Sequence, residues 1–120
     1  VMLRRRNRRH YAKSKEAARA LVHARLAYFN AFYGHTVGKV FIKNTKSRWG
    51  SCSRAGNLNF NYKILFLPPL LQDYLIVHEL CHLAEFNHGL KFWALVAQAA
   101  PNYRALRKQL RSIERSKNAL

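Results

Sequence analysis

Apolar side chains recur every three or four positions between Ser14 and Tyr33, which is the spacing of an amphipathic helix. Ser14 can cap the amino end of this helix and Gly34 can end it, so the helix should have about five turns. Its apolar stripe contains Ala18, Leu21, Val22, Leu26, Phe29 and Tyr33. Residues 1–13 carry six lysines and arginines, and the mutual repulsion of these charges predicts an extended or frayed basic arm.

The following part of the chain alternates between apolar and polar positions, which predicts strands. The alternation is strictest over Leu58–Tyr62, and shorter strands are predicted around Val40–Ile42 and within Arg48–Ser53. Because short links join them, including a hairpin turn at Arg54–Asn57, we expect a three-stranded antiparallel meander. Gly50, inside the second strand, indicates a bulge or a close backbone approach.

Residues 70–86 are apolar on almost every face, which is typical of a helix buried at the centre of a domain. Asn87-His88-Gly89 should break this helix, because asparagine and glycine tolerate left-handed turn conformations. Two more helices are expected, over Leu90–Ala97 and from near Asn102. The sequence therefore predicts a single α+β domain over residues 14–120, with a three-stranded sheet packed on a central helix.

The charge of the chain points to polyanions. Twenty-two lysines and arginines stand against five acidic residues, for a net charge of +17. Such a charge favours non-specific contact with nucleic acid, although a solvated coat of charge is the simpler alternative. Two cysteines are too few for a disulfide framework and are expected to be reduced in the cytoplasm. We expect neither a signal peptide nor a membrane segment, and the sequence does not indicate an oligomeric state.

The candidate chemistry lies in His78-Glu79-Leu80-Cys81-His82, an H-E-x-x-H pattern inside the buried helix. His78 and His82 are one helical turn apart, so both rings project from one face and can bind one zinc ion. His88 can be a third ligand only if the helix ends before it and the chain folds back. Three imidazoles leave an open position for water, whose pKa zinc lowers to about 7. Glu79 would then act as general base.

Two acidic residues leave alternatives open. Glu85 lies on the same helical face as His78 and competes with His88 as third ligand, although it fits tetrahedral geometry poorly. Glu85 and Asp73 could instead orient a ring nitrogen or be solvated charges. The histidine spacing matches that of the metzincins, but Glu85 stands where they have glycine. The only methionine, Met2, lies upstream, so the chain is not a metzincin.

The sequence around these histidines resembles the YgjP-like metallopeptidase family, which is related to the SprT-like and Spartan-type zinc proteases. The resemblance spans roughly residues 14–112 and includes Arg48–Ser53, Gly56–Asn61, Pro68, Tyr74–Leu83, Asn87-His88, Phe92-Trp93 and Pro101–Tyr103. It implies a small zincin fold of the minigluzincin type, with His78, His82 and His88 as zinc ligands and Glu79 as base. It also implies that an extended peptide binds along a sheet edge, here the Trp49–Ser53 strand.

Other residues in these motifs have less defined roles. Trp49 and Trp93 are expected to fill the core rather than to contact substrate. Tyr62, Tyr103 and Arg48 are candidates for stabilising the oxyanion, without a spacing argument for any of them.

The function expected from the sequence is zinc-dependent hydrolysis of peptide bonds, with action near nucleic acid as a further hypothesis. One alternative keeps the metal but hydrolyses nucleotide pyrophosphate bonds, although the chain has no glycine-rich phosphate loop. Another is a basic nucleic-acid-binding module without enzymatic activity.

Overall fold

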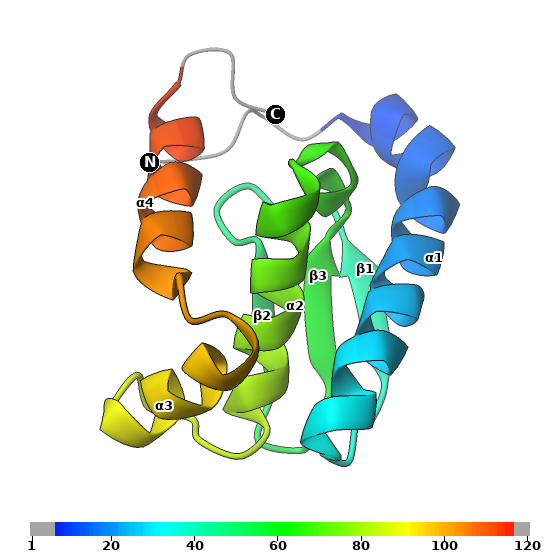
Figure 1. The fold of residues 1–120 in the computed structure, drawn as a ribbon. Helices are drawn as coiled ribbons and strands as arrows, with labels where there is room; N and C mark the ends of the chain where they lie inside the picture. Colours follow the sequence, from blue (N-terminus) through cyan, green and yellow to red (C-terminus); the bar gives the residue numbers. More distant parts are fainter. Residues whose placement is uncertain (1–6, 117–120) are drawn as a thin grey trace.

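The structure, a computed structural model, describes residues 7–116 as one α+β domain (Figure 1). Its helices and strands follow in the order α1 (Arg8–Tyr33), β1 (Val40–Lys43), β2 (Gly50–Cys52), β3 (Leu58–Asn61), the short 3-10 helix η1 (Tyr62–Phe66), α2 (Pro69–His82), α3 (Leu90–Ala99) and α4 (Tyr103–Arg115). The predicted α+β class is confirmed. In Figure 1, α2 lies against the sheet, with α1 on one side of it and α4 on the other.

Helix α1 begins at Arg8, so the predicted start at Ser14 and the extended arm over residues 8–13 are wrong. The Asn7 side chain accepts a hydrogen bond from the His10 N–H at 2.9 Å and caps the helix earlier than expected. The hydroxyl of Tyr11 also donates to the Ile42 carbonyl at 3.1 Å, which ties this first turn to the sheet. Residues 1–6 of the predicted arm lie outside the described residues.

The sheet is mixed, in the order β1-β3-β2, so the predicted antiparallel meander is also wrong. The hairpin between β2 and β3 is antiparallel as expected, and its turn includes Gly56 with a φ of 88°. By contrast, β1 runs parallel to β3. The side chain of Asn57 accepts the Lys39 N–H at 2.8 Å, and the Leu58 N–H donates to the Lys39 carbonyl at 2.9 Å. These bonds align the starts of β1 and β3.

Helix α2 forms the centre of the core. Pro69 stands at its first turn, and Leu71, Ile76 and Leu80 on it are at most 1% exposed. Asp73 on α2 forms a bidentate ion pair with Arg25 on α1, with N–O distances of 2.8 and 3.0 Å. This pair gives Asp73 a structural role, away from the histidines. No helix within residues 7–116 is long and apolar enough to cross a membrane.

Candidate active site

Three histidines meet where α2 ends. Because α2 stops at His82, the chain turns back and brings His88 beside the two helical rings, as the spacing required. The Nε2 atom of His88 lies 3.0 Å from Nε2 of His82 and 3.3 Å from Nε2 of His78. The predicted reason for the turn is wrong, since Gly89 has a φ of −93° and no described non-glycine residue has a positive φ.

A backbone carbonyl fixes the orientation of the His82 ring. Its Nδ1 atom lies 3.0 Å from the backbone carbonyl of Glu85, which can only accept a hydrogen bond. Nδ1 therefore carries the proton and Nε2 directs its lone pair toward the other two histidines. Burial lowers the pKa of His82, which favours the neutral ring that a metal needs. Glu85 thus acts through its backbone, and its carboxylate is not one of the converging groups.

Trp93 and Phe92 of α3 pack against the other side of the histidine cluster. Trp93 lies 5.9 Å from His88 in a stacked arrangement, and Phe92 stacks on His82 at 4.3 Å. Behind Trp93, the Tyr103 ring stacks at 4.8 Å between centroids. Burial, followed by the charges of the other two histidines, lowers the pKa of His88. Trp93 therefore supports the site and does not only fill the core.

The core prediction is confirmed for Trp49, and Trp93 is partly buried against the core. Trp49 is 7% exposed and donates from Nε1 to Glu114 at 2.9 Å. The sequence did not predict that Trp93 packs against the histidines. The sequence signals for Trp93 were the apolar spacing of α3 and the place of Phe92-Trp93 among the motifs that resemble the family.

Glu79 is buried beside the histidines. Its side chain is 5% exposed, and Oε2 lies 3.3 Å from Nδ1 of His78. Its other oxygen, Oε1, is buried with no hydrogen-bond partner among the described residues. A buried carboxylate oxygen without a partner is costly, so this atom is suited to a bound group that the cavity admits.

The close backbone approach predicted at Gly50 is confirmed by the Asn59 carbonyl, and the Glu79 side chain, which was not predicted, lies equally close. A Cβ atom at Gly50 would lie 3.0 Å from the Glu79 Oε2 atom and 3.0 Å from the Asn59 carbonyl oxygen. A side chain at this position would therefore occupy space that the carboxylate uses. Gly50 is the part of the site contributed by the sheet.

A cavity of about 210 Å³ opens between β2 and the cluster. Its lining residues come from β2, α2 and the loop after α2: Gly50, Ser51, Cys52, His78, Glu79, His82, Phe86 and His88. The strand β2 is an edge of the sheet, as expected for the Trp49–Ser53 segment. Burial raises the pKa of the Cys52 thiol to about 11, with a further contribution from Glu79, so the thiol stays protonated at neutral pH.

The donor set fits a metal ion. The three ring nitrogens lie within 4.8 Å of one another, and His78, His82 and His88 are the only such group among residues 7–116. Two neighbouring imidazoles with lowered pKa values and a carboxylate oxygen without a partner suit a small cation better than an empty space. Metal binding by these residues remains a prediction.

The three candidates for oxyanion stabilisation lie in different places. Tyr62 is remote from the cluster, since its hydroxyl pairs with Nδ1 of His10 at 2.9 Å. Tyr103 stacks on Trp93, which in turn lies against His88. Arg48 lines a different cavity, beside β2.

Comparison with known proteins decides the family. A family model described as "YgjP-like, metallopeptidase domain" matches residues 3–113. The chain belongs to the YgjP-like metallopeptidases. This membership confirms the resemblance found in the sequence and makes the protein a metal-dependent hydrolase. It also argues against the alternative of a module without enzymatic activity.

Two solved structures resemble the fold of this YgjP-like protein. The metallopeptidase zymogen abylysin of Pyrococcus abyssi is 23% identical, with a TM-score of 0.69 over 76% of this chain and 92% of that chain. The metallopeptidase zymogen jannalysin of Methanocaldococcus jannaschii is 22% identical, with a TM-score of 0.62 over 79% of this chain and 94% of that chain. A comparison with curated proteins found no match.

Proposed function

We propose that the protein is a zinc-dependent peptidase in which His78, His82 and His88 hold the metal and Glu79 is the general base. The observation that carries this proposal is the convergence of three Nε2 atoms, with His88 at 3.0 and 3.3 Å from its neighbours, beside the partnerless Oε1 of Glu79. Imidazole nitrogens are ligands that zinc favours, and three of them leave one position open for catalysis.

A bound zinc ion supplies Lewis acidity, which lowers the pKa of water and polarises the substrate carbonyl. Glu79 takes the proton of the attacking water on Oε1 and later delivers a proton to the leaving amine. Its Oε2 atom stays near His78, which keeps the carboxylate oriented between these two steps. The low exposure of the side chain, 5%, excludes bulk water from the proton transfer.

The free edge of β2 is suited to an extended peptide. The Asn61 N–H donates to the Trp49 carbonyl at 2.8 Å, so Trp49 and Ser51 direct their backbone groups toward β3. The backbone N–H and C=O groups of Gly50 and Cys52 therefore point toward the open edge. A peptide added as a fourth strand would pair with these groups and lie over the histidine cluster.

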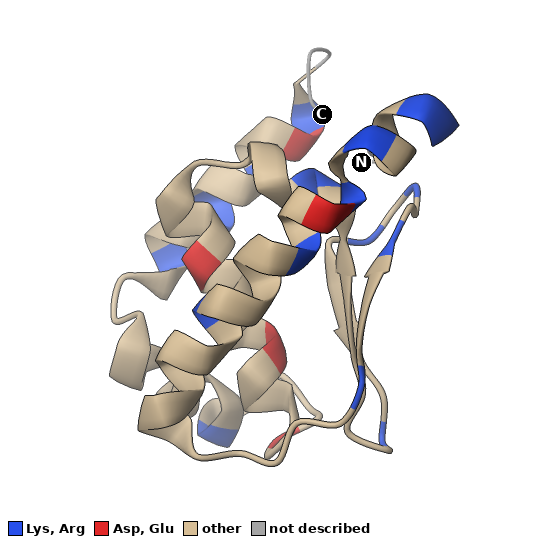
Figure 2. Cartoon of the chain, turned by 90° about the vertical axis from the view of Figure 1, so that its right-hand side faces the viewer, with Lys and Arg blue, Asp and Glu red and all other residues tan. Residues whose placement is uncertain are grey.

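Action near nucleic acid is a separate part of the proposal, and it is supported by charge alone. Figure 2 shows lysines and arginines spread over the helices and along the strands and loops, with few acidic residues between them. Exposed examples on α4 are Arg104, Lys108, Arg111 and Arg115. DNA binding that falls steeply with salt, while DNA leaves peptide cleavage unchanged, would reduce this part to non-specific adhesion.

The state of the cysteines supports a reducing compartment. Cys52 and Cys81 are both free thiols in the structure. Burial raises the pKa of Cys81 to about 11, so this thiol is as unreactive as that of Cys52. We therefore place the protein in the cytoplasm as part of the proposal.

The test combines metal content with peptide cleavage. Wild-type protein should hold one zinc ion per chain, and His88→Ala should lose it or bind it much more weakly. His23→Ala is the matched control, because it removes an exposed imidazole on α1 and should keep the metal. Glu79→Gln should keep the zinc ion and lose about 100-fold or more in kcat.

Other outcomes would contradict the proposal. Full zinc retention in His88→Ala would move the third ligand elsewhere. Unchanged cleavage by Glu79→Gln would remove the general base. Release of phosphate from nucleoside triphosphates, without any peptide cleavage, would favour the pyrophosphate-hydrolase alternative.

A further inference from the structure

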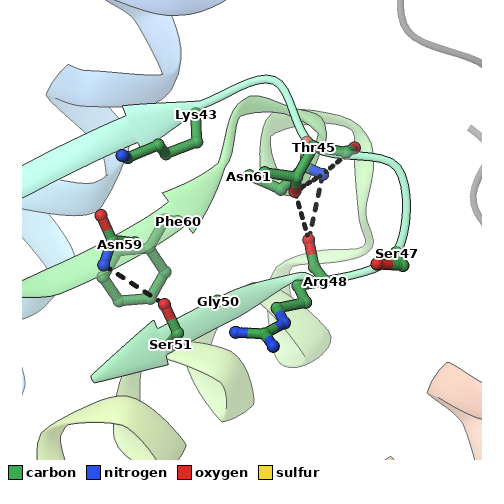
Figure 3. Close-up of a pocket in the computed structure, with 9 residues that line it drawn as sticks. All are labelled: Lys43, Thr45, Ser47, Arg48, Gly50, Ser51, Asn59, Phe60 and Asn61. Carbon is green, nitrogen blue, oxygen red and sulfur yellow. Dashed lines mark hydrogen bonds between the residues drawn. The ribbon is translucent and has the colours of Figure 1, made fainter. Parts of the chain in front are cut away.

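A second cavity, of about 320 Å³, lies on the outer face of the sheet (Figure 3). Leu58 and Phe60 of β3 are fully buried toward the helices, so the alternating residue Asn59 points the other way. Ser51 pairs with Asn59 and therefore shares this outer face. Lys43 also lies on this face, because it pairs with Asn61, two residues after Asn59 on β3. Figure 3 shows the side chains of Lys43, Asn59 and Ser51 on the same side of the strands.

The two cavities share the strand that we assign to substrate binding. Gly50 and Ser51 of β2 line both of them. Paired residues of neighbouring strands direct their side chains to the same face. In a peptide added to the edge of β2, the residue opposite Ser51 would therefore direct its side chain to the outer face. The residues on either side of it would face α2 and the histidines.

The outer cavity is positively charged and lacks acidic partners. Arg48 and Lys43 line it, and no carboxylate lies within ion-pair distance of either one among residues 7–116. Figure 3 shows the Arg48 guanidinium beside β2, extending toward Ser51. The amide of Asn59 donates to the Ser51 hydroxyl oxygen at 3.2 Å, so the hydroxyl hydrogen of Ser51 remains available to a ligand.

The loop that carries Arg48 is held in place by a buried amide. Asn61 is 1% exposed, and its Nδ2 atom donates to the carbonyls of Thr45 and Arg48 at 2.9 and 3.0 Å. The Thr45 hydroxyl also donates to the Arg48 carbonyl at 3.0 Å. A backbone fixed at these points reduces the entropy lost when Arg48 binds a ligand.

We propose that this outer cavity is a specificity subsite for the carboxylate side chain of one aspartate or glutamate in the substrate, with Arg48 as its main partner. The proposal rests on the proposed function, because the peptide on β2 places the acidic residue. The position of the cavity beside this edge favours a peptide side chain over a nucleic-acid phosphate. The fork of donors on arginine matches a carboxylate in size and charge.

The test uses blocked, unstructured peptides in which a single glutamate is moved along the sequence, each with a glutamine twin. Binding is measured on the zinc-loaded Glu79→Gln protein, and cleavage is measured on the wild type. At one position, the peptide with glutamate should bind and be cleaved about five- to tenfold better than its twin with glutamine. Arg48→Met should lose this preference, and Arg48→Glu should transfer it to lysine.

Lys46→Met is the matched control, since it removes one exposed positive charge from the same loop but lies outside the lining of the cavity. It should keep the preference for glutamate. The inference is overturned if no position distinguishes the twins, if no peptide binds, or if the preference survives in Arg48→Met. It is also overturned if Arg48→Met loses single-stranded DNA binding while the glutamate and glutamine peptides bind and are cleaved equally well. Preferential binding of a glutamate peptide without any cleavage would support the subsite and reject the proposed reaction.

Discussion

Gly50→Ala should displace the Glu79 carboxylate, which we propose as the general base, and should leave the proposed metal ligands in place. The new Cβ atom would lie 3.0 Å from Oε2 of Glu79 and 3.0 Å from the Asn59 carbonyl oxygen, whereas ordinary contacts begin at 3.4 Å. Asn59 pairs with Ser51 inside the sheet and cannot easily move, so Glu79 must shift by about 0.4 Å. A misplacement of about 1 Å costs roughly 100-fold in rate, so this shift should lower kcat about sixfold.

The assay is kcat for a cleaved peptide, measured together with zinc content and the free energy of unfolding. Zinc content should stay at the wild-type level, because the three atoms nearest to the added carbon belong to Glu79 and Asn59 and none of them to an imidazole. Overpacking should lower the free energy of unfolding by about 1–3 kcal/mol.

Gly56→Ala provides the control for stability. Gly56 has a φ of 88°, so alanine is strained there at a cost of about 1–3 kcal/mol, but its nearest neighbour is the Thr36 carbonyl oxygen at 3.9 Å. Gly56→Ala should therefore lose stability and keep its kcat. A wild-type kcat in Gly50→Ala, or the same loss of kcat in Gly50→Ala and Gly56→Ala, would refute the proposed role of Glu79 in the reaction.

Two further predictions follow from ionisation. Burial lowers the pKa of His82 and His88 below 6.5, so the unfolded chain binds more protons in acid. The neutral state of these two rings therefore stabilises the folded, metal-free protein above about pH 6.5, and this stabilisation should be lost as the pH falls through the lowered pKa values. Equal free energies of unfolding in urea at about pH 7.5 and about pH 5 would contradict this. The pKa of Cys52 is raised from 9.0 to about 11. Alkylation of Cys52 near pH 8 should therefore be about 100-fold slower in the folded, metal-free protein than in the unfolded chain. Equal rates would show an exposed thiolate and contradict this prediction.

The sequence located the helix that carries the proposed site because the relevant spacing is local. Residues four apart on a helix share a face whatever surrounds them, so the placement of His78 beside His82 needed no tertiary information. The requirement that the helix end before His88 followed from the same geometry. Gly34 also ends α1 as expected, since its φ of 69° is favourable for glycine.

The sheet order and the start of α1 could not be deduced in the same way. Alternation shows which face of a strand is buried, but it does not show which strand is its neighbour. The bond from Lys39 to the Asn57 side chain joins residues far apart in the chain, and it aligns β1 with β3 in parallel. The basic residues before Ser14 enter α1 because the Asn7 cap and the contact of Tyr11 with the sheet stabilise the first turns.

For the site, the sequence by itself determined that the two histidines of α2 share one helical face and that Glu79 lies one step round the helix from the first of them. Only the tertiary structure brought Gly50 against Glu79, stacked Trp93 on His88, and placed Arg48 beside the edge of β2. The physical reason is that backbone geometry fixes positions within one element. Contacts between elements depend instead on how side chains fill the space between them.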